Sequence, residues 1–143
     1  MAGDVLPDPS SPFGRRVRER LETERIVWFT TTGADGTPQP NPVWFVWQDG
    51  EFLVYNAAHA KRLDHIRDRP QVALHFNSDG QGSDVMVFSG LARPADTQPP
   101  AHENPAYVAK YGKAMKRVGG NLEAFSAQYP QVLRVKINKV RGY

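Results

Sequence analysis

Prolines stand at three alternate positions, 38, 40 and 42, inside a stretch that otherwise has the composition of a β-strand. Proline has no backbone N–H to give to a neighbouring strand, so it is confined to sheet edges and bulges. The stretch runs on as VWFVW, with the turn signals GADG before it and QDG after it. The sequence therefore predicts hairpins, with the first half of a strand over residues 37–47 at an edge or a bulge.

Five more strands are predicted from alternating apolar residues or from β-branched and aromatic runs. They are expected over residues 26–32, 51–56, 71–77, 84–94 and 132–137. Helices are expected over residues 11–24, 61–68, 105–118 and 121–130. Ser11 is expected to cap the first of them, with Pro12 as its first residue. Six short strands with little helix between them favour a small, mainly β barrel over a doubly wound sheet.

Spacing also predicts which side chains face inward. The inward helical residues are expected to be Phe13, Val17, Leu21, Leu63, Ile66, Tyr107, Tyr111, Met115, Val118, Leu122 and Phe125. On the strand after the prolines, Trp44 and Val46 share one face, while Val43, Phe45 and Trp47 share the other. One face would pack the barrel, and the other would offer a flat apolar surface.

Composition limits the class of protein. A chain of 143 residues with 40% apolar residues suits one folded domain, expected over residues 13–143 behind a flexible leader over 1–12. No apolar run has the length of a membrane span, so no membrane partner is expected. The absence of cysteine fits a cytoplasmic protein, and a net charge of +3 does not by itself indicate nucleic acid.

Two adjacent cations, Lys61 and Arg62, begin the helix that comes after the strand ending at Tyr55 and Asn56. A helix N-terminus presents free N–H groups and a partial positive charge, so two cations there suit a phosphate. Asn56 would cap this helix or donate to the same anion. The alternative is a solvated basic surface in which Lys61 joins the neighbouring charges, and on charge alone that outcome is the more frequent.

Other signals are weaker. The four histidines share no metal-ligand spacing, so no metal site is expected. No glycine-rich dinucleotide fingerprint comes after a strand. Tyr55 and His75 are candidate proton donors, but packing and structural hydrogen bonds are the more frequent roles for such residues.

The run GADGTPQPNPVWFVWQDGEFLVYNAAHAKRLDHIRDRPQVALHF resembles the split β-barrel flavin and deazaflavin oxidoreductases of the pyridoxamine-5'-phosphate-oxidase-like superfamily. It is more similar to the actinobacterial branch of probable coenzyme F420-dependent enzymes. The shared pattern is an Asp-Gly-x-Pro turn at residues 35–38, Pro-Val-Trp-Phe at 42–45, Tyr55, and the basic pair Lys61-Arg62. This resemblance implies a six-stranded antiparallel split β-barrel of the FMN-binding type, a homodimer, and a phosphate clamp at the basic pair.

By the same resemblance, the second strand lines the cofactor ring and the residues after Tyr55 hold the phosphate. The implied cofactor-binding residues are Asn41, Pro42, Val43, Trp44, Tyr55, Asn56, His59, Ala60, Lys61, Arg62 and Asp84. Relatives commonly place Ser or Thr where this chain has Ala60, so the phosphate would depend more on Asn56, His59 and backbone N–H groups.

The function implied is hydride transfer between coenzyme F420 and a small organic substrate, with no catalytic side chain assigned. FMN-dependent oxidation and a non-catalytic flavin or deazaflavin carrier or sensor are the alternatives. The anionic tail of coenzyme F420 needs further cations, for which Arg67, Arg69 and Lys113 are candidates.

Overall fold

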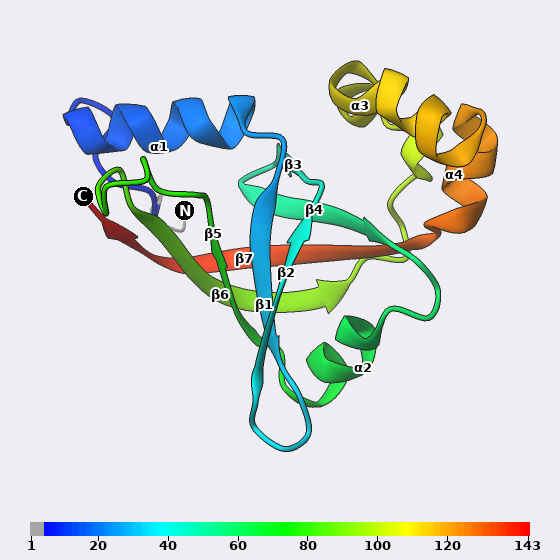
Figure 1. Cartoon of the computed structure of the whole chain (residues 1–143), viewed down its shortest axis with the longest axis horizontal. Helices are drawn as coiled ribbons and strands as arrows, with labels where there is room; N and C mark the ends of the chain where they lie inside the picture. Colours follow the sequence, from blue (N-terminus) through cyan, green and yellow to red (C-terminus); the bar gives the residue numbers. More distant parts are fainter. Residues whose placement is uncertain (1–4) are drawn as a thin grey trace.

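The computed structural model describes residues 5–143. Its elements, in chain order, are α1 Pro12–Thr23, β1 Val27–Thr32, β2 Pro38–Val43, β3 Val46–Gln48, β4 Glu51–Asn56, α2 Lys61–Asp68, β5 Gln71–His75, β6 Met86–Pro94, the short 3₁₀ helix η1 Ala101–Glu103, α3 Pro105–Gly119, α4 Leu122–Gln128 and β7 Gln131–Gly142. Figure 1 shows the curved sheet at the centre, with α1 along one side, α3 and α4 together on another, and α2 beside the hairpin of β1 and β2.

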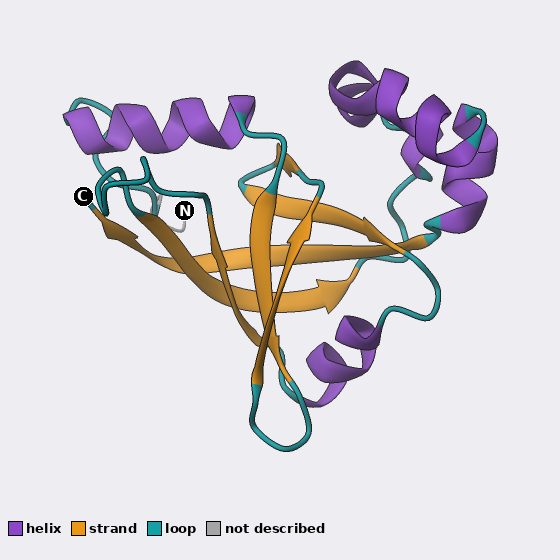
Figure 2. Ribbon diagram, viewed as in Figure 1, coloured by secondary structure: helices purple, strands orange, loops and turns teal. Residues whose placement is uncertain are grey.

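All seven strands form one antiparallel sheet in the order β2-β1-β5-β6-β7-β4-β3. The strands β2 and β3 are consecutive in the chain, yet they lie at opposite edges. Only Trp44 and Phe45 separate them, and three residue steps span at most about 11 Å. The sheet must therefore curl until its edges approach, which gives the half-barrel seen in Figure 2.

The mainly β class is confirmed, but the prediction of six strands is wrong, because the stretch over residues 37–47 is two strands. The break lies at Phe45, whose backbone bonds to α3 instead of to a strand. Its N–H donates to the hydroxyl of Tyr111 at 3.0 Å, and its carbonyl accepts from the same hydroxyl at 3.0 Å and from Lys110 at 2.9 Å. The edge position of the prolines is confirmed, since β2 pairs only with β1.

Buried side chains gather in two groups. One fills the half-barrel under α1 and includes Val17, Leu21, Val43 and Phe45, with Trp47 packed against it. The other lies between the sheet and the pair α3 and α4. Its members include Val46, Tyr55, Tyr107, Tyr111, Met115 and Phe125, with Trp44 packed against it. The predicted faces of residues 43–47 are confirmed, whereas Val118 is 43% exposed instead of inward.

A local hydrogen bond sets the start of α1, whereas the length of the last strand depends on pairing with distant strands. Ser11 caps α1 by accepting from the N–H of Gly14 at 2.9 Å. The last strand extends well beyond the predicted 132–137, because β7 pairs with β4 over residues 131–136 and with the whole of β6 over residues 133–142. Of the predicted leader, residues 1–4 lie outside the described residues, while Leu6 packs against the barrel core.

Two kinds of feature are absent from residues 5–143. No helix there has the length and apolar character that a membrane span requires. No group of three or more His, Cys, Asp or Glu side chains in the same range is placed to hold a metal ion.

Candidate functional site

An apolar cavity of about 440 Å³ opens where the ends of β2 and β4 face α3 and α4. Binding pockets for small molecules commonly have volumes of about 300–1,000 Å³. The lining residues are Ile26, Pro42, Val43, Trp44, Tyr55, Asn56, Ala57, Ala60, Arg62, Tyr107, Val118, Phe125 and Tyr129. This cavity therefore brings together the second strand, the end of β4 and the start of α2, as the sequence predicted, and adds a wall of helical aromatics.

Trp44 is fixed in that wall. Its ring stacks on Tyr111 with centroids 4.7 Å apart and on Phe125 at 5.5 Å. The bonds from Tyr111 and Lys110 to Phe45 hold the backbone next to it. The ammonium of Lys110 also lies 3.8 Å from the centre of the Phe45 ring, and burial lowers the pKa of Lys110 to about 8. The flat surface is thus held by α3 before any ligand arrives.

Tyr55 has its hydroxyl committed to the protein. The hydroxyl donates to the carbonyl of Pro99 at 2.8 Å and accepts from the side-chain amide of Asn104 at 3.3 Å. Burial raises the pKa of Tyr55, against the opposing effect of the Asn104 hydrogen bond. This arrangement makes Tyr55 a structural part of the wall and a poor proton donor.

Asn56 does not cap α2, contrary to one of the two roles expected for it. The N-cap is Ala60, which makes no side-chain capping bond. The amide nitrogen of Asn56 instead donates to the carbonyls of Val54 and Gln131, at 3.0 and 3.1 Å. Its oxygen accepts from Nη1 of Arg62 at 2.6 Å. Asn56 therefore aims the guanidinium, and its own donors are already used.

A second, polar cavity of about 240 Å³ lies on the other side of Arg62, between the β1–β2 hairpin and α2. Its lining is Thr31, Gln39, Asn41, Ala60, Lys61, Arg62 and His65. Thr31 and Gln39 are directly opposed in the register of β1 and β2, and Asn41 is two residues further along the same face. Ala60 and Arg62 line both cavities, so the two are adjacent.

The basic pair is not neutralised by its neighbours. The side chain of Lys61 makes no hydrogen bond or ion pair within residues 5–143, and the side chain of Arg62 has only its bond to Asn56. The nearby carboxylates Asp64 and Asp68 pair with Arg67 instead, at 3.2 and 3.7 Å. Burial lowers the pKa of Arg62, yet a guanidinium keeps its charge in proteins. Two cations next to a cavity therefore keep most of their donors for a ligand.

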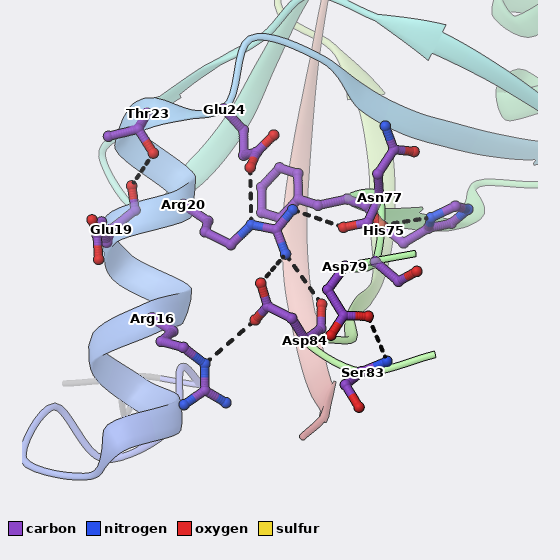
Figure 3. Close-up of polar contacts among 12 residues, drawn as sticks. Arg16, Glu19, Arg20, Thr23, Glu24, His75, Asn77, Asp79, Ser83 and Asp84 are labelled. Carbon is purple, nitrogen blue, oxygen red and sulfur yellow. Dashed lines mark hydrogen bonds and ion pairs between the residues drawn. The ribbon is translucent and has the colours of Figure 1, made fainter. Parts of the chain in front are cut away.

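Two predicted cofactor residues lie outside both cavities. His59 is exposed in the turn before α2. Asp84 is turned toward α1, where its carboxylate pairs with Arg16 at 3.4 Å and Arg20 at 3.1 Å, as Figure 3 shows. Arg20 also donates to Glu24 and to the carbonyl of Asn77. Asp84 is thus part of the link between α1 and the loop before β6, away from the cavities of its own chain.

The remaining candidates from the sequence are also placed. His75 lies on β5, outside both cavities, with Nδ1 next to the carbonyl of Phe76. Arg69 donates to the carbonyl of Thr32. Lys113 lines a separate groove on the outer side of α3 together with Arg25, Lys110 and Lys116. These side chains therefore do not join the basic pair.

The family assignment rests on the whole length of the domain. The sequence profile of the pyridoxamine 5'-phosphate oxidase family matches residues 13–143. The chain belongs to this family. The resemblance seen in the sequence is thereby confirmed at the level of the split-barrel family.

Solved structures agree with this assignment at the level of the fold. An F420 reductase has a TM-score of 0.66 at 19% identity, covering 87% of this chain and 94% of that one. An FAD-binding protein from Mesorhizobium loti has a TM-score of 0.60 at 16% identity, covering 88% of each chain. The heme storage protein HutZ from Vibrio cholerae has a TM-score of 0.61 at 13% identity, covering 90% and 92%. No curated protein matches the sequence.

For a member of the pyridoxamine 5'-phosphate oxidase family, the paired cavities separate two kinds of chemistry. The larger one offers a rigid apolar wall with few polar groups, which suits a flat aromatic ring. The smaller one offers cations and amides, which suit an oxyanion. The sequence did not indicate Thr31, Gln39 and His65 in the smaller cavity or Tyr129 in the larger one, and Tyr107 and Phe125 were predicted as core residues alone. Their spacing indicated burial, but nothing in it indicated which cavity they would face.

Proposed function

We propose that the protein binds a flavin-type cofactor with a phosphate, coenzyme F420 in particular, and transfers hydride between this cofactor and a small organic substrate. The observation that carries the proposal is the sharing of Ala60 and Arg62 by an aromatic-walled cavity and a cationic one. A ring at one end and an anion at the other is the shape of a flavin or deazaflavin. The similarity of fold to an F420 reductase and an FAD-binding protein supports the same class of ligand.

Different residues would hold the ring and the phosphate of the cofactor. Pro42, Val43 and Trp44 would support one face of the ring, and Lys61 with Arg62 would neutralise the phosphate. The bound cofactor would supply hydride chemistry, while the protein orients it and excludes competing reactions. Since the Tyr55 hydroxyl is occupied by Pro99 and Asn104, we assign no general acid.

The alternatives differ in the ligand and in whether turnover occurs. An FMN-dependent oxidoreductase would use the same two cavities with a shorter anionic chain. A non-catalytic carrier or sensor would bind the same cofactor without turnover. Haem held by a histidine, cysteine or methionine is not supported, because none of these residues is among the described residues that line the apolar cavity.

We also propose that two copies of the chain associate. A groove of about 980 Å³ on the sheet is lined in part by Val5, Leu91 and Trp47, and Leu91 is 46% exposed. Apolar groups of this kind on the surface are often covered by a partner. Light scattering in dilute solution should give twice the mass of the chain, and a monomer that binds cofactor tightly would contradict the proposal.

Parallel fluorescence titrations with coenzyme F420 and FMN test the choice of cofactor. We expect tighter binding of coenzyme F420, and the absorption spectrum and mass of any copurifying small molecule should agree. Tighter binding of FMN would favour the FMN alternative, and binding of neither would refute the proposed function. Oxidation of reduced cofactor on addition of an acceptor, faster than without protein, separates the enzyme from a carrier.

A further inference from the structure

The polar cavity contains a histidine that no other part of the site explains. His65 is on α2, one turn after Lys61, and it lines the cavity with that lysine, Arg62 and the amides of Gln39 and Asn41. Neither amide side chain has a hydrogen-bond partner within residues 5–143. Ala60 contributes only a methyl group, and the donors of Asn56 are used by backbone carbonyls. The cavity is therefore rich in unused donors, and His65 is one of its walls.

The ring of His65 is held in place by a buried hydroxyl. Nδ1 of His65 lies 2.8 Å from Oγ1 of Thr31, a residue on β1 with only 1% of its surface exposed. This is the only hydrogen-bond partner of that hydroxyl within residues 5–143. A buried hydroxyl needs an acceptor for its proton, so in neutral His65 the Thr31 hydroxyl donates to Nδ1 and the proton of the ring sits on Nε2. In protonated His65, Nδ1–H donates to Thr31, and Nε2 still carries a proton.

From this geometry we propose that His65 is an anion ligand of the polar cavity, donating from Nε2 to a phosphate oxygen, with Thr31 as its positioning residue. The assignment rests on the proposed function for the identity of the ligand, a phosphate-bearing flavin or deazaflavin. It gives the site a third side-chain donor beside Lys61 and Arg62. His65 takes the place that the sequence had suggested for His59, which is exposed and lines neither cavity.

The charges around His65 fix the sign of its pH dependence. Lys61 and Arg62 share the cavity from α2, and the β2 residues in its lining are uncharged amides. From the β1–β2 turn comes Asp35, an exposed carboxylate whose pKa is lowered chiefly by the N–H of Thr37 and to a lesser degree by His65. Asp64 is engaged by Arg67. A proton on an imidazole adds a positive charge that favours an anionic ligand, so the contribution of His65 to phosphate binding should strengthen as the pH falls.

Substitution of His65 tests the proposal with two flavins that differ only in the phosphate, FMN and riboflavin. His65→Gln should weaken FMN on the order of tenfold, the loss expected for one hydrogen bond to a charged group. It should leave the affinity for riboflavin unchanged. His75→Gln, a half-buried histidine outside both cavities, is the matched control and should bind both flavins like the parent. Equal losses for FMN and riboflavin, or no loss, would overturn the proposal.

Two further measurements separate a ligand from a structural histidine. From about pH 8 to about pH 6, the parent should gain more FMN affinity than His65→Gln, since titration of the phosphate itself is common to both. Thr31→Val should weaken FMN, and Thr31→Ser, which keeps the hydroxyl, should restore it. Identical pH profiles for parent and His65→Gln would remove His65 from the site.

Inorganic phosphate distinguishes failure of this inference from failure of the proposed function. The NMR signal of the His65 ring, identified by its loss in His65→Gln, should shift when phosphate is added to the parent protein. If FMN and coenzyme F420 fail to bind but this shift occurs, the proposed function is wrong and the anion site stands. If a flavin binds and the signal does not move with phosphate or FMN, the anion site lies elsewhere.

Discussion

Arg62 donates from Nη1 to the side-chain oxygen of Asn56 across 2.6 Å, and Asn56 in turn donates to the backbone carbonyls of Val54 and Gln131. One amide therefore joins the end of β4, the start of β7 and the start of α2. The guanidinium that both cavities share is aimed by the sheet, because its only side-chain partner within residues 5–143 is itself held by two backbone carbonyls.

Asn56→Asp should weaken the phosphate-bearing cofactor by more than tenfold without removing a ligand group. The new carboxylate would pair with Arg62 and offset its charge, and it would lose the donors to Val54 and Gln131. Each of the two lost hydrogen bonds is worth about 0.5–1.5 kcal/mol, so the free energy of unfolding should fall as well. Urea unfolding and FMN titration measure the two effects. Unchanged binding would mean that Arg62 is not part of the anion site.

Tyr111→Phe should disturb the wall of the apolar cavity through the backbone. The hydroxyl of Tyr111 bonds the N–H and carbonyl of Phe45 and the carbonyl of Arg25. Its loss leaves the buried N–H of Phe45 without a partner, at a cost of about 1–3 kcal/mol in the free energy of unfolding. The affinity of Tyr111→Phe for riboflavin, which reports on the ring site alone, should also be lower than that of the parent. Tyr143→Phe, which removes only an exposed hydrogen bond to the carbonyl of Gly82, is the control and should change neither.

Local signals were enough to predict the hairpins, the proline edge, the Ser11 cap and the position of Lys61 and Arg62 at the start of a helix. The break at Phe45 could not be predicted, because it depends on Tyr111, 66 residues further along the chain. The role of Asn56 likewise depends on Gln131, 75 residues away. In the sequence, His65 was considered only as a metal ligand, and the spacing of the histidines did not support a metal site. Its position opposite Thr31 is set by how α2 packs on β1.

Glu51 should make the fold sensitive to acid. Its carboxylate accepts two hydrogen bonds from Arg93 and one from Arg134, and the Arg93 hydrogen bond is the main cause of its lowered pKa. A lowered pKa stabilises the fold at pH values above the ordinary value of 4.5, and this contribution disappears as the pH falls through the lower folded-state value. Glu51→Gln should lose stability at pH 7 and have a shallower decline below about pH 4.5.

Urea unfolding of Glu51→Gln and the parent at several pH values checks this prediction. Asp96→Asn, an exposed carboxylate in a loop, is the control, and its acid decline should match that of the parent. Parallel curves for Glu51→Gln and the parent at all pH values would show that the ion pairs of Glu51 do not contribute to the pH dependence of folding.

Lys61 and Arg62 should each be needed for the phosphate, whichever flavin proves to be the cofactor. A hydrogen bond to a charged group is worth about 1.5–3 kcal/mol, so Lys61→Ala or Arg62→Ala should raise the dissociation constant of FMN on the order of ten- to a hundredfold. Arg62→Lys should recover only part of the loss, because a point charge replaces a planar fork that must reach both Asn56 and the ligand. The free energy of unfolding of Lys61→Ala should change by less than about 0.5 kcal/mol, since Lys61 is exposed and its side chain makes no hydrogen bond or ion pair within residues 5–143. Lys139→Ala, an exposed lysine on β7, is the control for a change in net charge alone. If Lys61→Ala and Arg62→Ala bind FMN as tightly as the Lys139→Ala control, the basic pair is not a phosphate site. It is then the solvated basic surface that charge alone suggested.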